Sequence, residues 1–175
     1  MPRQLLVGLL ALLAPLSGCA QERRYTQPNS AMEPTIRANE KFAANPNSYR
    51  DSAPRRGDVV IFEHEDVLQV KRVVAAAGDT IRGEDFKIFL NGQVLHEGYI
   101  QHAGPRQLQP SVLYLSTFGP VKVPEGYIFV MGDNRDYSHD SRDPTYGLIS
   151  IASVRGQALR IVESSDPKRV GSAIQ

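Results

Sequence analysis

Short apolar runs, rich in Val, Ile, Phe and Tyr and interrupted by Gly, Pro or Asn, set the strongest limit on how this chain can fold. Such residues suit a pleated, half-buried backbone, and runs of about four to eight residues are typical of strands. The clearest example is Phe86–Leu90, followed by Asn91-Gly92 and then Gln93–Leu95. Both central positions of a tight hairpin turn need a positive φ, which Asn and Gly tolerate. The sequence therefore predicts a β-hairpin over residues 86–95.

The same pattern marks further short strands. They are expected at residues 58–62, 67–74, 111–118, 121–123 and 127–131, with one or two more between 147 and 162. Residues 101–110 fit neither a strand nor a helix and are expected to form a loop or an insertion. The chain shows no repeat, heptad or long amphipathic helix. Together these features predict a mostly β fold built on an antiparallel sheet.

Composition excludes several classes of protein. A chain of 175 residues suits one domain, and a net charge of +1 with mixed signs provides no basic surface for nucleic acid. The single cysteine rules out an internal disulfide and a Cys-type zinc site. The 4 histidines are scattered without ligand spacing. We therefore expect no metal, no cofactor and no nucleic-acid partner.

The N-terminus has the form of an export signal, with Arg3 followed by an apolar run from Leu5 to Leu16. This run is shorter than the roughly 20 residues that cross a bilayer. It ends in Leu16-Ser17-Gly18-Cys19, which resembles the lipobox of bacterial lipoproteins. The resemblance implies a signal peptide over residues 1–18 and lipid on the Cys19 thiol. An ordinary secretory signal and a short uncleaved anchor are the alternatives.

The expected organisation of the rest follows from this leader. Residues 21–27 are polar, so residues 19–27 are expected to be the lipidated cysteine and a tether. Residues 28–165 are expected to be the β domain, and residues 166–175 a frayed polar tail. A lipid on Cys19 implies a membrane-anchored lipoprotein in a bacterial cell envelope, facing the periplasmic side. The residues do not decide between inner and outer membrane, nor the oligomeric state.

Three blocks carry the chemistry: residues 29–35 (Asn-Ser-Ala-Met-Glu-Pro-Thr), Lys71-Arg72, and residues 132–142 (Gly-Asp-Asn-Arg-Asp-Tyr-Ser-His-Asp-Ser-Arg). In order and wording they resemble the signal peptidase I family, whose first block reads Ser-Met-x-Pro-Thr. The resemblance implies a β-rich Ser/Lys peptidase domain that binds an extended segment of an exported pre-protein as an added strand. Ala31 stands at the nucleophile position.

Lys71 lies in an apolar strand, beside Val70, Val73 and Val74. A lysine serves as a general base only when neutral, and its free pKa of about 10.4 prevents that near neutral pH. Burial lowers a lysine pKa by up to roughly 3 to 5 units. The resemblance implies that Lys71 is the general base, whereas an ordinary strand lysine is the alternative.

The block from 132 to 142 crowds small and polar residues that cannot form a regular helix. The resemblance implies that Ser138 orients the Lys71 amine and that Asp140 and Arg142 form a bracing ion pair. It also implies that Gly132 and Asp133 shape the wall of the site. A polar loop stabilised by its own side chains is the alternative.

In the first block, Pro28 and Pro34 disfavour helix at the residues before them and predict an extended segment. Asn29 and Ala31 would then share one face, and Ser30 would point away. By resemblance the Asn29 amide is a candidate oxyanion donor. Met32 and Pro34 are expected at the substrate groove.

Three functions follow from these residues. The first is a signal peptidase I-like serine endopeptidase that removes signal peptides, with Ser30 as substitute nucleophile if a bulge turns it toward Lys71. Activation of a water by Lys71 is a less favourable route to the same reaction. The second is an inactive pseudo-peptidase that binds signal-like extended peptides. The third is a structural envelope lipoprotein.

Overall fold

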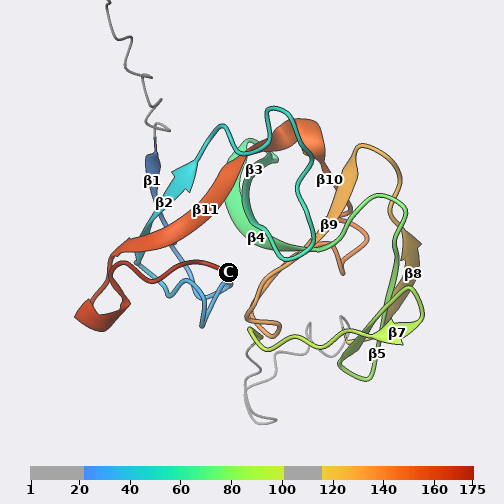
Figure 1. Cartoon of the computed structure of the whole chain (residues 1–175). Coiled ribbons are helices and arrows are strands. Elements are labelled where there is room, and N and C mark those ends of the chain that lie inside the picture. Colours follow the sequence, from blue (N-terminus) through green and yellow to red (C-terminus); the bar gives the residue numbers. More distant parts are fainter. Residues whose placement is uncertain (1–21, 101–115) are drawn as a thin grey trace, which may run out of the picture.

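The strands and short helices of this protein are known from a computed structural model that describes residues 22–100 and 116–175 (Figure 1). The strands are β1 (Arg23–Thr26), β2 (Lys41–Asn45), β3 (Val59–His64), β4 (Val67–Ala75), β5 (Thr80–Glu84), β6 (Lys87–Leu90), β7 (Gln93–Val94), β8 (Phe118–Lys122), β9 (Tyr127–Met131), β10 (Ile149–Ser150) and β11 (Val154–Glu163). Two 3-10 helices, η1 (Ile151–Ser153) and η2 (Pro167–Arg169), complete the elements. The predicted mostly β class is confirmed.

Two antiparallel sheets make up the described chain. The larger has 7 strands in the order β1-β2-β11-β3-β4-β9-β10, and the smaller has 4 in the order β7-β6-β5-β8. Figure 1 shows β3 and β4 strongly bent within the larger sheet, with the smaller sheet set to one side beyond β9. Strands distant in sequence are thereby brought together, since β11 lies between β2 and β3.

The predicted hairpin is present as β6 and β7. Asn91 and Gly92 join them with φ values of 51° and 83°, and Leu90 pairs with Gln93. The positive φ at both positions is the reason that this dipeptide could be recognised in the sequence.

Alternation along β3 explains why its apolar run shows no polar face. Val59 and Ile61 belong to one core cluster, while Val60 and Phe62 belong to another on the opposite face. Successive side chains point to opposite faces of a sheet, so a strand covered on both faces is apolar throughout. A third cluster, around Ile81 and Phe129, joins the smaller sheet to β4 and β9.

Two predicted boundaries are wrong. Residues 23–26, predicted to be part of the tether, form β1 and pair with β2. The apolar pattern did not predict β2 either. The tail is not frayed, because Ile174 packs on the core and its N–H donates to the Leu159 carbonyl at 2.8 Å. Both segments are held by long-range pairing, which a local polar sequence does not reveal.

The leader, Cys19, the predicted loop at 101–110 and most of the predicted strand at 111–118 lie outside the described residues. Within residues 22–100 and 116–175, no helix has the length and apolar character needed to cross a membrane.

Candidate active site

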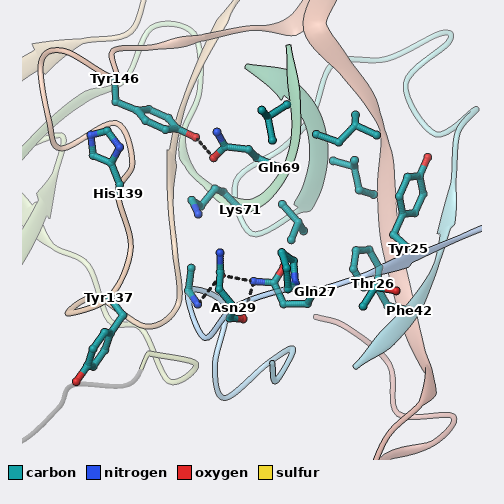
Figure 2. A pocket seen from close by; sticks show the side chains of 16 residues that line it. Tyr25, Thr26, Gln27, Asn29, Phe42, Gln69, Lys71, Tyr137, His139 and Tyr146 are labelled. Carbon is teal, nitrogen blue, oxygen red and sulfur yellow. Dashed lines mark hydrogen bonds between the residues drawn. The ribbon is translucent and has the colours of Figure 1, made fainter. Parts of the chain in front are cut away.

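A pocket of about 410 Å³ lies against the larger sheet and is bordered by β1 and the first half of β4. Its lining comes from β1 and the segment after it, from Phe42 of β2 and Ile61 of β3, from the first half of β4, and from the region after β9 (Figure 2). The lining includes Gln27, Asn29, Ala31, Gln69, Lys71 and Tyr146. The pocket therefore unites residues from all three sequence blocks or their immediate neighbours.

Two sheet edges border this pocket. Among the strands that the structure describes, β1 is at the end of its sheet and pairs with β2 alone. β4 pairs with β9 only from Arg72 onward, so residues 67–71 of β4 have no strand partner on that side in the described chain. Free backbone N–H and C=O groups at such edges can pair with an added strand.

The segment carrying Ala31 is a turn, so the predicted extended conformation is wrong. The Glu33 N–H donates to the Ser30 carbonyl at 3.1 Å, and the Ile36 N–H donates to the Met32 carbonyl at 2.9 Å. These local bonds close the backbone on itself despite the two prolines. The two-residue alternation used to orient Ser30 and Ala31 therefore does not apply.

Within this turn Ala31 lines the pocket and is only 4% exposed, whereas Ser30 is not part of the pocket lining. Met32 is fully buried in the core cluster that includes Phe42, a pocket-lining residue. Met32 thus lies beneath the pocket wall. Pro34 is exposed and does not line the pocket.

The backbone N–H of Ala31 has a partner within its own segment. It donates to Asn29 Oδ1 at 3.1 Å, and Gln27 Nε2 donates to the same oxygen at 2.9 Å. The structure therefore directs the oxygen of the Asn29 amide, and not its nitrogen, at Ala31. The expected donor role of Asn29 requires the amide to leave this position first.

Lys71 is 6% exposed and its amine faces the pocket, between Gln69 and Asn29 in Figure 2. Burial lowers the pKa of this amine below its ordinary value, although the carboxylates of Asp140 and Asp133 act in the opposite direction. Within residues 22–100 and 116–175 the amine has no hydrogen bond or ion pair. Lys71 thus has the burial that a neutral, proton-accepting lysine needs.

The loop after β9 is braced by its own side chains. Arg142 donates to Asp140 from Nε at 2.8 Å and from its second terminal nitrogen at 3.0 Å, and the Gly132 N–H donates to Asp140 at 3.0 Å. Burial raises the pKa of Asp140, but the charge and hydrogen bonds of Arg142 outweigh it and hold the pKa below its ordinary value. The buried carboxylate is therefore ionised and holds the loop.

Ser138 belongs to the same network. Its Oγ accepts from the Gly132 N–H at 3.1 Å and its hydroxyl donates to Asp140. No hydrogen bond joins Ser138 to Lys71 in the part of the chain that the structure describes. The observed contacts of Ser138 are thus with the loop that flanks Lys71.

Gly132 sits where the first and third blocks touch. A Cβ built on it would lie 2.3 Å from Ser138 Oγ and 2.4 Å from the Ala31 carbonyl oxygen. The Asn134 N–H donates to that same carbonyl at 3.1 Å. The absence of a side chain at 132 therefore allows the turn at Ala31 to pack against the loop.

Arg72 is a functional neighbour whose role the sequence pattern did not reveal. It is 1% exposed and binds Asp133 through two hydrogen bonds, at 2.8 and 2.6 Å. Thr35 donates to the same carboxylate at 2.5 Å. An arginine next to Lys71 in an apolar strand needs a buried anion as its partner. This requirement is the sequence signal from which the pairing of Arg72 with an acidic residue could have been predicted. Asp133 thus ties the turn to β4.

Gln69 and Tyr146 were also missed. The Tyr146 hydroxyl donates to Gln69 Oε1 at 2.7 Å, and His64 and His139 pack against the Tyr146 ring with centroids 4.2 and 5.0 Å away. No three potential metal-ligating side chains come together among residues 22–100 and 116–175. The two histidines therefore belong to an aromatic cluster at the end of the pocket.

Comparisons with known proteins agree with the three blocks. A family model described as signal peptidase, peptidase S26, matches residues 3–162. A signal peptidase I of Leptolyngbya laminosa is 32% identical over 87% of this chain and 74% of its own length. Signal peptidase I S of Bacillus subtilis is 36% identical over 75% of this chain and 72% of its own length.

Two further matches carry the same name. A probable signal peptidase I-2 of Synechocystis is 34% identical over 78% of this chain, and the aligned part is 61% of that protein. A crystal structure of a signal peptidase I from Enterococcus faecalis is 32% identical, with a TM-score of 0.48 over 59% of this chain and 95% of that one.

Proposed function

Since the chain belongs to the signal peptidase family, peptidase S26, we propose that it is a signal peptidase I-like endopeptidase that takes signal-peptide segments of exported proteins into its pocket. One observation supports the proposal: Ala31 and Lys71, the nucleophile and base positions that the resemblance implies, line one pocket. The free edges of β1 and β4 flank them.

The two edges favour an extended peptide as the ligand. A segment lying between β1 and the first half of β4 can pair its backbone with both strands. The pocket wall offers apolar surface from Phe42, Ile61 and Val70. The resemblance to the signal peptidase I family implies a peptide with small residues at the first and third positions before the cut, and such residues suit this wall. A peptide bound in this way would place one of its carbonyl groups between Ala31 and Lys71.

Lys71 supplies the proton-transfer half of the reaction. As a neutral amine it takes a proton from the attacking hydroxyl or water, and as an ammonium group it returns the proton to the leaving nitrogen. The attacking atom is the missing part, because alanine carries no hydroxyl. Hydrolysis by the chain as it stands requires Ser30 to turn into the pocket or a water to attack.

The side chain at position 31 favours a second candidate. With Ala31 in the lining and Ser30 outside it, the described part of the pocket has the candidate base Lys71 and a binding surface but no serine hydroxyl. Capture of a signal-like peptide without cleavage is the function that these residues can still perform. Both candidates share the peptide site and differ only in turnover.

One experiment tests the shared site and separates the candidates. The full chain is titrated with a peptide containing Ala-Leu-Ala and with the same peptide N-methylated at alternate residues. Strand pairing predicts that methylation abolishes binding, because it removes the backbone donors. Product formation that disappears in Lys71→Met supports the peptidase, and binding without product supports capture. If neither peptide binds, both candidates fail.

We also propose that the domain works tethered to a bacterial envelope membrane through Cys19, on the periplasmic side. The support is the lipobox-like sequence before Cys19. An uncleaved anchor is the competing arrangement, since the family match begins at residue 3 and includes the apolar run. Mass spectrometry of the membrane-extracted protein decides: lipid on Cys19 with loss of residues 1–18 supports the tether, and an intact N-terminus refutes it.

A further inference from the structure

A residue that lines the pocket has its backbone N–H occupied by a neighbouring side chain. Ala31 lines the pocket, and its N–H donates to Asn29 Oδ1 at 3.1 Å instead of pointing at open space. A peptide carbonyl that enters beside Ala31 can accept this N–H only in exchange for Asn29 Oδ1. Asn29 therefore stands in for a ligand carbonyl.

The orientation of the Asn29 amide follows from its neighbours. The oxygen receives the Ala31 N–H and one N–H of Gln27, whose second N–H goes to the Asn29 backbone carbonyl at 3.0 Å. An amide turned by 180° would set its NH₂ group against two donors. The oxygen therefore faces Ala31 whenever the side chain is in place.

Gln27 holds this arrangement from a fixed position. It is 3% exposed. Its backbone N–H donates to the Glu40 backbone carbonyl at 2.9 Å, and its backbone carbonyl accepts from the Asn39 N–H at 2.7 Å. Asn29, in contrast, is exposed. Its side chain can leave the pocket for water while Gln27 stays in place.

We propose that the Asn29 side chain, positioned by Gln27, is a displaceable internal ligand of the Ala31 N–H and sets the affinity of the pocket for a peptide carbonyl. This inference rests on the proposed peptide site. Peptide binding exchanges the Asn29 oxygen for the ligand oxygen, so the parent chain loses one internal hydrogen bond on binding. Removing the Asn29 side chain leaves the donor open in advance.

The expected effect is a gain in affinity. A neutral hydrogen bond contributes a net 0.5–1.5 kcal/mol, which corresponds to a roughly 2- to 10-fold change in binding. Asn29→Ala should tighten binding of the Ala-Leu-Ala peptide by that factor. Gln27→Met, which removes the two N–H donors but keeps the length, should tighten it in the same direction by less.

Asn45 provides a matched control outside the pocket. Its Oδ1 accepts from the Asn47 N–H at 2.9 Å, the same kind of contact that joins Asn29 and Ala31. Amide hydrogen exchange of the full chain without peptide should become faster at residue 31 in Asn29→Ala and at residue 47 in Asn45→Ala. Only the first substitution should change peptide affinity.

The outcomes separate this inference from the proposed function. Unchanged exchange at residue 31 in Asn29→Ala, or unchanged peptide affinity, overturns the internal-ligand role. Weaker binding also overturns it and makes the Asn29 nitrogen a donor to the ligand. General damage to the fold lowers affinity and so cannot imitate the expected gain. If no variant binds the peptide, the proposed peptide site fails, and the inference that depends on it fails too.

Discussion

Under the proposed function, replacing Ala31 by serine supplies the side-chain nucleophile that position 31 lacks. The substitution adds a single hydroxyl to a side chain that is 4% exposed. A buried hydroxyl without a partner destabilises a fold by about 1–3 kcal/mol. Because the Lys71 amine lines the same pocket and has no partner among the described residues, it can accept this hydroxyl. We therefore expect Ala31→Ser to change the free energy of unfolding by less than about 1 kcal/mol.

The change in turnover should be far larger. Removing the nucleophile of a serine peptidase lowers turnover by roughly 10⁶-fold, and residual activity reflects binding and charge stabilisation alone. Restoring it in an otherwise assembled site should raise cleavage of an Ala-Leu-Ala peptide by about 10⁴- to 10⁶-fold. The assay compares the full chain as it is, Ala31→Ser, and Ala31→Ser combined with Lys71→Met, at equal peptide saturation. The last variant should return to the rate of the parent.

The pH profile provides a second check. Burial lowers the pKa of Lys71, so the rate of Ala31→Ser should rise with pH as this amine loses its proton, with a midpoint below 10.5. The reasoning is refuted if Ala31→Ser binds peptide yet cleaves within tenfold of the parent rate. Equal, substantial rates in both forms that disappear in Ser30→Ala would instead assign the nucleophile to Ser30.

Three other predictions concern stability. Burial lowers the pKa of Lys71 in the folded chain below 10.5, so the unfolded chain binds this proton more tightly than the folded chain does. Lys71→Met should therefore raise the free energy of unfolding at neutral pH, by an amount that shrinks as the pH approaches 10.5. A difference in calorimetry that does not change with pH argues against this reasoning. Burial raises the pKa of the Glu40 carboxyl, but hydrogen bonds, chiefly from Arg169, outweigh it and lower this pKa from 4.5 to about 2. The lowered pKa contributes about 3 kcal/mol to the free energy of unfolding, and this contribution is lost as the pH falls from 4.5 to 2. Arg169→Met should remove most of this pH dependence, and an unchanged acid transition counts against the assignment. Gly132→Ala should destabilise the fold by more than about 3 kcal/mol and abolish peptide binding, because its Cβ would lie 2.4 Å from the Ala31 carbonyl oxygen, while Gly98→Ala, with open space around it, should do neither.

The sequence by itself determined the local features that depend on few residues. Asn91-Gly92 specified its hairpin because both positions need a positive φ, and β9 could be recognised as an apolar run ending at Met131. Family membership was also readable, because the blocks around Ala31, Lys71 and Gly132 are unusual words in a fixed order. None of these conclusions requires knowledge of which strands are neighbours.

Only the tertiary structure decided how those blocks meet. β1 looked like a polar tether because end strands need few apolar side chains, and its pairing with β2 depends on residues far away. The prolines at 28 and 34 suggested an extended segment, but hydrogen bonds at Ser30 and Met32 close it into a turn. That turn puts Ala31 in the pocket, leaves Ser30 outside it, and gives the Ala31 N–H to Asn29. Side-chain orientation within a turn depends on three-dimensional packing. The sequence pattern therefore identified the missing hydroxyl at position 31, but not the hydrogen bond from the Ala31 N–H to the Asn29 side chain.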